Sequence, residues 1–303
     1  MERTYTREIK NICTDFLNRV HIPFEIRKPD QPIFDDCCRA ARQMGIVLDD
    51  KRSILQYLGS ASNIAALAYG HLEHDKQVYI ALYTASAIGL DETCSSDVES
   101  LKNFTHRFIM GKVHGHPIMD SYDMIVRQLP DRFESFAAEA MLQSALDFCV
   151  GLVMEHELLK KPALSRPSTQ FPTFLRDLTG ISRLYGILVF PDGTPLRSWM
   201  ESIPSVIDFI SYANDVLSFY KEKLANESNN YISVKARSKG CTNLEALQMA
   251  VDQAVKAYEE SVAVLEHSPD ALEAFQQFCR GYVHFHIADK RYKIAELWAS
   301  SQC

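Results

Sequence analysis

The amino-acid sequence predicts an all-α fold in a single domain that spans residues 1–303. Apolar residues recur at helical spacing from the segment "LQYLGSASNIAALAYGHLEHD" onward, and no run alternates apolar and polar residues between turn signals as a strand would. The chain contains only 12 Gly and 12 Pro, and its 47% of hydrophobic residues can fill a sizeable core. Because the connections between periodic segments are short, we expect one helical bundle without a domain boundary.

In chain order, the helix over residues 76–91 is apolar on almost every side and should therefore lie inside the bundle. The next helix is expected to begin at Ser96, whose pairing with Glu99 predicts a capping box. That helix start accounts for Asp97 without a metal. Turn residues then interrupt the helical periodicity at "VHGHP" and at Pro130.

The second half of the chain has two interruptions, "KKPALSRPSTQFP" and "FPDGTPLRS", before another almost fully apolar helix over residues 203–220. Thr242 with Glu245 predicts a further capping box, and Ser268 followed by Pro269 predicts another helix start. In total we expect roughly ten helices of about 10 to 30 residues.

The charge balance and the cysteines restrict the function classes. The formal net charge is -7 and no basic run appears, so we expect no nucleic-acid partner. The N-terminal residues lack the apolar core of a secretory signal, and the longest apolar run, "VYIALYTASAIGL", is shorter than the about 20 residues of a membrane span. The 8 cysteines show neither C-x-x-C nor disulfide-scaffold spacing. We therefore expect a soluble cytoplasmic protein with reduced thiols and no stable membrane insertion.

The helix segment "YANDVLSFYKEK" places Asn214, Ser218 and Glu222 four residues apart. At about 100° per residue, the three side chains span only about 80° of one helix face. An amide oxygen, a hydroxyl and a carboxylate are hard donors that suit Mg²⁺ better than Zn²⁺. The same spacing also fits the solvated end of an amphipathic helix, with Asp215 and Lys221 facing water, so the pattern alone leaves both interpretations open.

Two acidic residues stand at the C-terminal end of the apolar helix over residues 76–91. Asp91 and Glu92 oppose the helix dipole there, which costs some tenths of a kcal/mol or more unless a cation compensates. A divalent metal shared with a facing helix would supply that compensation. An exposed acidic loop is the alternative.

Two further segments combine arginine with hydroxyl or glycine residues. "FLRDLTG" supplies Arg176, Thr179 and Gly180, and "ADKRYKIAELW" supplies Arg291 and Tyr292. A guanidinium can bind a phosphate through two N–H groups, and a tyrosine hydroxyl can donate to the same group. Taken separately, each arginine also fits an ordinary surface or ion-pair residue.

These segments occur in the order "LDE", "FLRDLTG", "NDVLSFYKE" and "GYVHFHIADKRYKIAE". In that order and at those separations, the chain resembles the trichodiene synthase group of class I terpene cyclases over about residues 75–295. The resemblance is most specific at the last two motifs. It implies a class I terpenoid synthase helical bundle around a central active-site cavity, farnesyl diphosphate as substrate, three Mg²⁺ ions, a carbon–oxygen lyase reaction that makes a sesquiterpene, and a homodimer.

The resemblance also implies roles for single residues. Asn214, Ser218 and Glu222 would bind one Mg²⁺, and Asp91 would bind the other two. The substrate diphosphate would be bound by Arg176, Lys221, Arg291 and Tyr292. In the wider class, the residue at the Arg176 position senses the diphosphate, and Thr179 and Gly180 stand where the signal passes to the substrate. Among these, Asp91, Arg176, Arg291 and Tyr292 are the expected catalytic residues.

The sequence departs from the family pattern in its acidic motif. Asp91 is followed by Glu92 and then by Thr93, Cys94 and two serines before Asp97, where the family keeps several acids. The chain also stops soon after Tyr292, without the long tail of trichodiene synthase. We expect activity to survive, because the first Asp is the essential ligand in such enzymes, with weaker metal affinity.

The chemistry implied by the resemblance needs no nucleophilic Ser or Cys. Metal and basic residues would neutralise the diphosphate as the allylic C–O bond breaks, and the resulting cation must be kept from water. Aromatic faces can stabilise such a cation by about 0.5 to 2 kcal/mol each. The candidates are Tyr83, Phe148, Phe209, Tyr212 and Phe285, although buried aromatics are more often simply part of the core.

Two other functions stay open from the sequence. A non-catalytic prenyl-diphosphate-binding protein could carry a decayed acidic motif after Asp91. A helical metal-dependent phosphohydrolase could instead use paired histidines and nearby acids to hold a dinuclear metal centre. The residues for such a centre are His71, His74, Asp75, His114, His116, His284 and His286.

Overall fold

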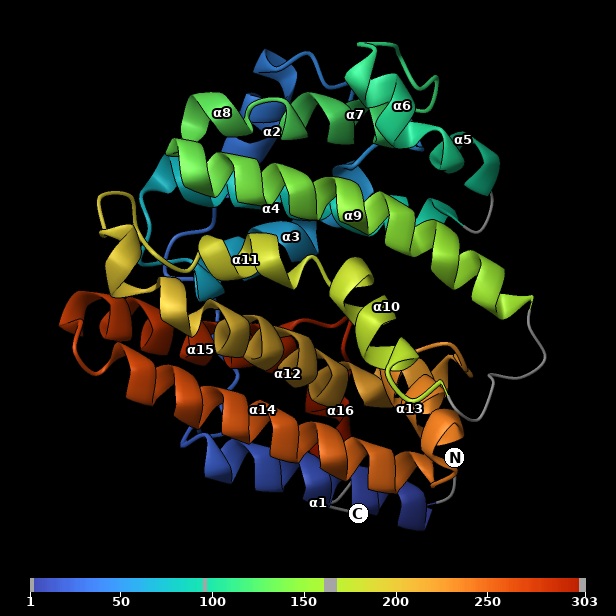
Figure 1. Cartoon of the computed structure of the whole chain (residues 1–303), viewed down its shortest axis with the longest axis vertical. Coiled ribbons are helices and arrows are strands. Elements are labelled where there is room, and N and C mark those ends of the chain that lie inside the picture. Colours follow the sequence, from blue (N-terminus) through green and yellow to red (C-terminus); the bar gives the residue numbers. More distant parts are fainter. Residues whose placement is uncertain (1–2, 95–96, 161–167, 300–303) are drawn as a thin grey trace.

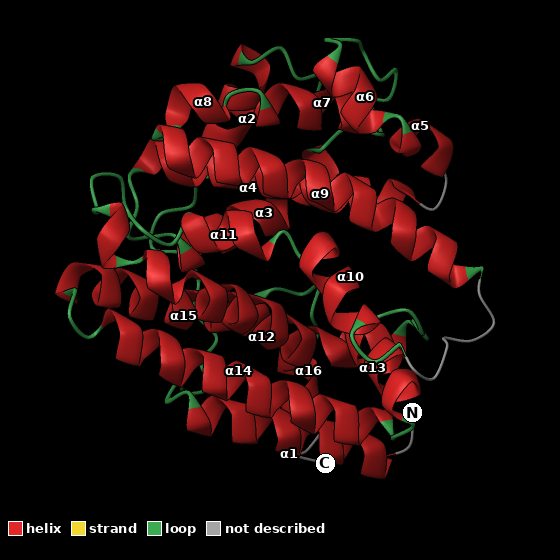
Figure 2. Cartoon of the chain, in the orientation of Figure 1, coloured by secondary structure: helices red, strands yellow, loops and turns green. Residues whose placement is uncertain are grey.

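The computed structural model describes residues 3–94, 97–160 and 168–299 of the chain (Figure 1). Within these ranges every regular element is a helix, which confirms the all-α prediction (Figure 2). The α-helices are α1 (Arg3–Arg19), α2 (Phe34–Gln43), α3 (Leu55–Ala68), α4 (His74–Cys94), α5 (Val98–Lys102), α6 (Phe104–Ile109), α7 (Pro117–Val126), α8 (Leu129–Arg132), α9 (Ser135–Leu159), α10 (Phe171–Thr179), α11 (Ser182–Ile187), α12 (Ile203–Leu224), α13 (Tyr231–Lys239), α14 (Asn243–Leu265), α15 (Pro269–Ala288) and α16 (Ile294–Ala299). Two short 3-10 turns, η1 (Leu196–Ser198) and η2 (Met200–Ser202), precede α12.

Helices α4 and α12 form the interior of the bundle, as their apolar sequences predict. Between Val78 and Leu90 of α4, only Ile88 is not fully buried. Helix α4 packs against α2, α3, α7 and α9, while α12 packs against α11, α14, α15 and α16. The bundle therefore surrounds both of the helices whose ends carry the predicted metal ligands.

The predicted starts of α14 and α15 are found where the sequence places them. Thr242 accepts from the backbone N–H of Glu245, whose carboxylate accepts in return from the backbone N–H of Thr242, which completes the capping box. Ser268 is the N-cap residue of α15 and Pro269 is its first helical residue.

The start of α5 differs in detail from the prediction. Asp97, and not Ser96, is its N-cap residue, and its carboxylate accepts from the backbone N–H of Ser100 at 3.3 Å. Ser96 itself lies outside the described residues. The structure thus agrees that a helix start accounts for Asp97.

The expected number of helices was too low because several helices are short. Helices α5, α6, α8, α11 and α16 have four to six residues each, which is too few for a periodic apolar pattern to be recognised. Pro130 lies in the first turn of α8, where its missing N–H costs nothing, so it does not end a helix.

Helix α9 is the one element in the described residues that is long and apolar enough to span a membrane by length and composition. The sequence analysis had placed the longest apolar run in α4 instead. A core helix of a soluble protein meets the same criterion, and α9 packs against α8, α10, α11 and α5 within the bundle. Its C-terminal half reaches the site described next.

Candidate active site

One cavity, of about 280 Å³, brings together all ten of the predicted site residues. Helices α4, α9, α10, α12 and α15 contribute its walls, with the segments after α12 and after α15 at its polar end. The predicted residues that line it are Asp91, Arg176, Thr179, Gly180, Asn214, Ser218, Lys221, Glu222, Arg291 and Tyr292. Segments far apart in sequence therefore meet at one place, which the separate motifs could not establish.

The stripe on α12 faces this cavity. Ser218 is 2% exposed, and its hydroxyl interacts with the Glu222 carboxylate one helical turn later. Burial raises the pKa of Glu222 to about 7, against the opposing effect of the neighbouring Lys221 charge. Oxygen groups gathered in so poorly solvated a place fit a cation, which would offset the cost of their burial.

The amide of Asn214 is bound on both of its ends. Its nitrogen donates to Nε2 of His286 at 3.1 Å, and its oxygen accepts from the Arg176 guanidinium at 3.3 Å. His286 is completely buried, and burial lowers its pKa to about 4, so the imidazole is neutral.

Asp91 lies in the last turn of α4, at the open end of the cavity. The Asp91 side chain remains accessible to solvent. Desolvation by the surrounding protein, and then the charge of Glu92, raise its pKa, whereas the charges of Arg291 and Lys221 act in the opposite direction. Glu92 accepts a hydrogen bond from the Arg291 guanidinium at 2.8 Å. The two acids of "LDE" thus differ, because Glu92 is engaged by Arg291 whereas Asp91 faces the cavity.

Arg176 forms a buried ion pair with Asp215. Its Nε lies 2.9 and 3.1 Å from the two carboxylate oxygens, and its Nη2 donates to the Ser211 carbonyl at 3.0 Å. Burial opposes the charge of Arg176, but Asp215 outweighs that effect and the pKa of the arginine is raised. Asp215 is therefore buried inside the bundle, which excludes the solvated helix end that the sequence had left open.

The junction between α10 and α11 is sterically tight. A Cβ atom on Gly180 would lie 2.5 Å from Nη1 and 2.8 Å from the carbonyl oxygen of Arg176, so the guanidinium can occupy this place only beside glycine. The next residue, Ile181, has φ 52° in the left-handed region, an unusual conformation for a β-branched residue. Thr179 donates from its hydroxyl to the Leu175 carbonyl at 3.1 Å.

Lys221 and Tyr292 stand together at the polar end of the cavity. The Lys221 ammonium lies 5.8 Å from the centre of the Tyr292 ring. Burial raises the pKa of the Tyr292 hydroxyl to about 12, so this group remains a hydrogen-bond donor at neutral pH. Together with Arg176 and Arg291, they give the cavity two guanidinium groups, an ammonium and a hydroxyl that can bind an anion.

The sequence analysis missed Glu155 of α9, which lines the same cavity. Burial raises its pKa to about 7, and Asp91 and Glu222 add to the effect through their charges. Asn229 donates to its carboxylate at 3.0 Å. The signal that identified Asp91, an acid near the end of an apolar helix, applies equally to Glu155 and could have found it.

The aromatic candidates divide into two groups. Phe148 and Phe285 line the cavity, whereas Tyr83, Phe209 and Tyr212 do not, and the prediction for these three was wrong. On α12, Phe209 and Tyr212 are five and two residues from Asn214, so they point well away from its face. Tyr185 and Tyr282, which were not among the candidates, line the cavity with their aromatic rings instead.

The histidine pairs do not form a metal centre. Among the described residues, no group of three or more His, Cys, Asp or Glu lies close enough together to hold a metal ion, and this applies to the acids of the large cavity as well as to the histidines. His71 contacts the Val189 carbonyl, His74 pairs with Asp36, and His114 pairs with Asp123. These sites are separate, so the arrangement that a dinuclear phosphohydrolase needs is absent from this part of the chain.

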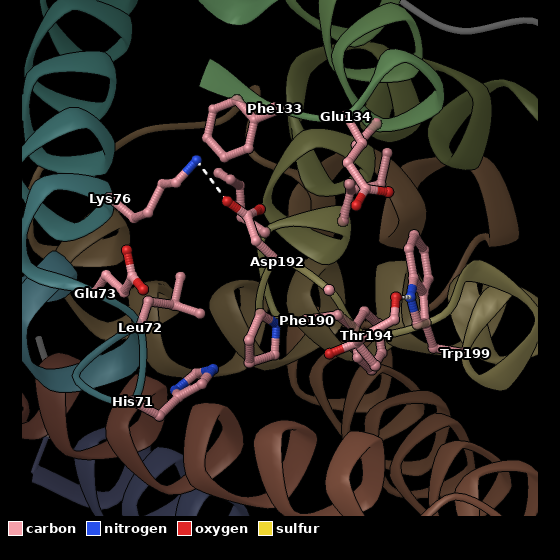
Figure 3. A pocket seen from close by; sticks show the side chains of 15 residues that line it. His71, Leu72, Glu73, Lys76, Phe133, Glu134, Phe190, Asp192, Thr194 and Trp199 are labelled. Carbon is pink, nitrogen blue, oxygen red and sulfur yellow. Dashed lines mark hydrogen bonds and ion pairs between the residues drawn. The ribbon is translucent and has the colours of Figure 1, made fainter.

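A smaller cavity of about 120 Å³ lies near the opposite end of α4 (Figure 3). Lys76 lies 2.8 Å from the carboxylate of Asp192, and its ammonium stands 4.1 Å from the centre of the Phe133 ring. Phe190 and Trp199 stack at 4.8 Å on another wall. None of the ten predicted site residues lines this cavity. Its lysine is already paired, so the larger cavity is the candidate active site.

Comparison with known proteins gives a consistent result. A family model described as trichodiene synthase matches residues 36–302. Alpha-cuprenene synthase COP6 of Coprinopsis cinerea is 30% identical over 294 residues, covering 96% of this chain and 90% of that protein. Terpene synthase 29 of Postia placenta is 31% identical over 252 residues, covering 82% of this chain and 73% of that protein.

Solved structures share the fold at lower sequence identity. A linalool/nerolidol synthase from Streptomyces clavuligerus superposes with a TM-score of 0.66 at 14% identity, covering 88% of this chain and 98% of that one. An a-eudesmol synthase gives a TM-score of 0.59 at 17% identity, with the same coverage of the two chains. The helical bundle therefore has the class I terpene synthase fold.

Proposed function

This chain belongs to the trichodiene synthase family, and on that premise we propose that it is a Mg²⁺-dependent sesquiterpene cyclase. The substrate would be farnesyl diphosphate, and the products would be diphosphate and a cyclic C15 hydrocarbon or alcohol. The observation that carries the proposal is the convergence of the α12 stripe, Asp91 and four anion-binding side chains on one cavity. Each component alone has an ordinary explanation, but their combination matches the needs of diphosphate ionisation.

The residues at the polar end fit magnesium. Asn214, Ser218 and Glu222 each offer an oxygen ligand, which Mg²⁺ prefers, and all three line the same cavity. Asp91 stands on the facing helix and would hold the other ions of a three-metal cluster. When bound, the cluster supplies Lewis-acid stabilisation of the diphosphate leaving group.

We further propose that Glu155 contributes a second carboxylate to this cluster. Glu92 is engaged by Arg291, so it is poorly placed to act as the second acid of the motif that follows Asp91. Glu155 lines the same cavity as Asp91 and Glu222, and after burial the charges of both acids help to raise its pKa. Gathering several carboxylates in one poorly solvated cavity is costly without a cation, and a cation would offset that cost.

The basic residues would hold the diphosphate as its charge develops. Arg176, Lys221, Arg291 and Tyr292 line the cavity, and each carries an N–H or O–H donor. Arg176 is already bound to Asp215, so the guanidinium is oriented before the substrate arrives. Thr179 and Gly180 follow Arg176 within one helical turn. They would transmit the binding of the diphosphate from Arg176 to the hydrocarbon part of the substrate.

The other walls suit a hydrocarbon chain and a carbocation. Ile64, Ile88, Ile210 and Ile181 supply apolar surface, and the rings of Phe148 and Phe285 add aromatic faces. Such walls exclude water and can stabilise a cation through the ring faces without reacting with it. A structure similar to this chain is of the Streptomyces clavuligerus synthase in complex with 2-fluorogeranyl diphosphate, which supports a prenyl diphosphate as the ligand class.

The test is to incubate the purified protein with farnesyl diphosphate and Mg²⁺, with and without EDTA, and to analyse the extract by gas chromatography with mass detection. We expect a cyclic C15 product that EDTA abolishes. Geranyl diphosphate is the comparison substrate, because one similar protein is named a monoterpene synthase. Failure to turn over either substrate, with no Mg²⁺-dependent diphosphate binding, would overturn the proposal.

Two companion measurements separate the alternatives. If Asp91→Asn leaves every activity and diphosphate binding unchanged, a non-catalytic binding protein becomes the better explanation. Phosphatase activity that depends on zinc and not on magnesium would favour the phosphohydrolase. Gel filtration of the same preparation tests the expected soluble homodimer.

A further inference from the structure

The histidine pair "VHFH" on α15 is not explained by the proposed function, and its two members differ in the structure. His284 and His286 are both buried, at 3% and 0% exposure. Nε2 of His284 has no hydrogen-bond partner among the described residues. His286, in contrast, is bonded through both ring nitrogens, and one of its partners is the proposed metal ligand Asn214.

The contacts of His286 fix its tautomer. Nδ1 lies 2.8 Å from the carbonyl oxygen of Tyr282, one turn earlier on α15. A carbonyl oxygen can only accept, so Nδ1 carries the proton of the neutral ring. Nε2 must then present its lone pair, and it faces the side-chain nitrogen of Asn214 at 3.1 Å. The helix backbone therefore determines that this ring is an acceptor toward Asn214.

The same contacts determine which way the Asn214 amide points. With its NH₂ group donating to the Nε2 lone pair, its oxygen lies on the opposite side, where the Arg176 guanidinium donates to it at 3.3 Å. A flipped amide would set its oxygen against the Nε2 lone pair and its NH₂ group against the N–H groups of Arg176. Both contacts would then be repulsive, so this network allows only one orientation.

We propose that His286 is a positioning residue that keeps the oxygen of Asn214 on the side away from the imidazole ring, where the oxygen and not the nitrogen is the atom available to a metal ion. The inference rests on the proposed function, because it assigns a role relative to the Mg²⁺ that Asn214 would bind. A ligand oxygen held in place before the ion arrives loses little freedom on binding, and partners behind metal ligands typically change affinity 10- to 100-fold when they are removed.

The ring is also held firmly in place by its neighbours. The centre of the Tyr292 ring lies 4.3 Å from that of His286, and the Tyr282 ring lies 4.5 Å away, nearly perpendicular to it. Because the imidazole cannot move without displacing these rings, its lone pair stays directed at α12. Helix α15 thus contributes to the metal site without supplying a ligand.

Three substitutions test the proposal. His286→Phe keeps a flat ring but removes the acceptor, so the amide of Asn214 is held from one side only, by Arg176. His286→Gln can restore an acceptor oxygen. His284→Phe is the matched control, because it removes a buried histidine of the same motif that does not contact Asn214.

The first readout is the dissociation constant for Mg²⁺ in the presence of inorganic diphosphate, measured by isothermal titration calorimetry. The second is the Mg²⁺ concentration that gives half-maximal turnover. For His286→Phe we expect both values to rise at least 10-fold. For His286→Gln and His284→Phe we expect changes below 3-fold. Unfolding curves in EDTA show whether each variant is folded, so a loss of stability is not mistaken for a loss of metal affinity.

Two results would overturn the inference while leaving the proposed function intact. In the first, His286→Phe binds Mg²⁺ as tightly as the wild type does. In the second, His284→Phe and His286→Phe weaken Mg²⁺ binding equally, which indicates a general effect of core disruption. A wild-type protein that binds neither Mg²⁺ nor diphosphate would overturn the proposed function, and this inference with it.

Discussion

The guanidinium of Arg176 and the carboxylate of Asp215 form an ion pair across the interface between α10 and α12, with both side chains nearly excluded from solvent. The acid is the neighbour of the proposed ligand Asn214, and the arginine is the proposed diphosphate sensor. This pair therefore links the helix of the proposed metal ligands directly to the helix of the proposed diphosphate sensor.

Asp215→Asn should destabilise the protein, because it leaves a buried guanidinium without a counter-charge. Removing one partner of a buried pair costs about 3 kcal/mol or more, to be measured as the free energy of unfolding in urea. Asp15→Asn is the control, since Asp15 pairs with Arg19 at the surface and should cost less than about 1 kcal/mol. Equal effects of the two substitutions would contradict the assignment of a buried pair.

Gly180→Ala should lower turnover of farnesyl diphosphate at least 10-fold, because the new methyl group would displace the Arg176 guanidinium. Gly186→Ala, on the following helix, is the control: its added methyl group would meet its nearest neighbour at an ordinary 3.4 Å. Steady-state kinetics on both variants gives the comparison. A Gly180→Ala enzyme with wild-type turnover would show that the position of this arginine is not critical.

Glu155→Gln should weaken Mg²⁺ binding and at the same time stabilise the metal-free protein at pH 8. The carboxylate shares a poorly solvated cavity with Asp91 and Glu222, so removing its charge relieves repulsion when no cation is present. Titration calorimetry with diphosphate and thermal unfolding in EDTA measure the two effects. Glu139→Gln, at an exposed position of the same helix, should change neither.

Lys235 should make stability depend on pH. Burial, with a smaller effect of the nearby Lys239 charge, lowers the pKa of Lys235 to about 8, and the Asp215 charge acts in the opposite direction. The ammonium donates hydrogen bonds to the Tyr231 hydroxyl at 3.0 Å and to Gln253. Between pH 8 and about 10.4, the unfolded chain binds more protons than the folded one, so this group makes stability rise with pH.

Below pH 8 the cost of the buried Lys235 charge is present in full. Lys235→Met should therefore be more stable than the wild type at pH 7, by at most about 3 kcal/mol less the value of the lost hydrogen bonds, and this advantage should shrink by pH 10. Urea unfolding of both proteins at the two pH values measures it, with the exposed Lys112→Met as control. An advantage independent of pH would mean that packing, and not charge, is responsible.

Gly281→Ala should prevent stable folding, because α15 crosses α3 too closely for a side chain. A Cβ atom there would lie 1.8 Å from the carbonyl oxygen of Leu67, so the two helices would have to separate at a cost of about 3 kcal/mol or more. Gly59→Ala, on α3 with no neighbour within 4 Å, should instead stabilise its helix by up to about 1 kcal/mol. Circular dichroism during thermal unfolding distinguishes the two outcomes.

The sequence was sufficient for the fold class, because helical spacing is a local regularity, whereas the set of cavity residues came from the family resemblance. Helical spacing identified the long helices, and the four-residue interval on α12 identified one face of the site. Glu155 carries the same local signal as Asp91, an acid near the end of an apolar helix, but only the fold shows that it shares a cavity with Asp91 and Glu222. Phe209 and Tyr212 were misjudged because a buried aromatic can face any of several neighbouring helices.

Other features depend on three-dimensional contact and have no local signature. The pairing of Arg176 with Asp215 joins residues 39 apart, and the contact of Asn214 with His286 joins residues 72 apart. In the sequence, Asp215 was equally compatible with a solvated surface. The pairing could be established only once the bundle had placed α10 and α15 on either side of α12.

The fixed acceptor on His286 also constrains how the two positions can change during evolution. A descendant with Asp at position 214 would place an oxygen against the Nε2 lone pair, where the present ring has no proton to offer. Such a change can persist only if position 286 becomes a donor toward α12 as well. The residues at positions 214 and 286 should therefore covary across related chains, although the two positions lie on different helices and 72 residues apart.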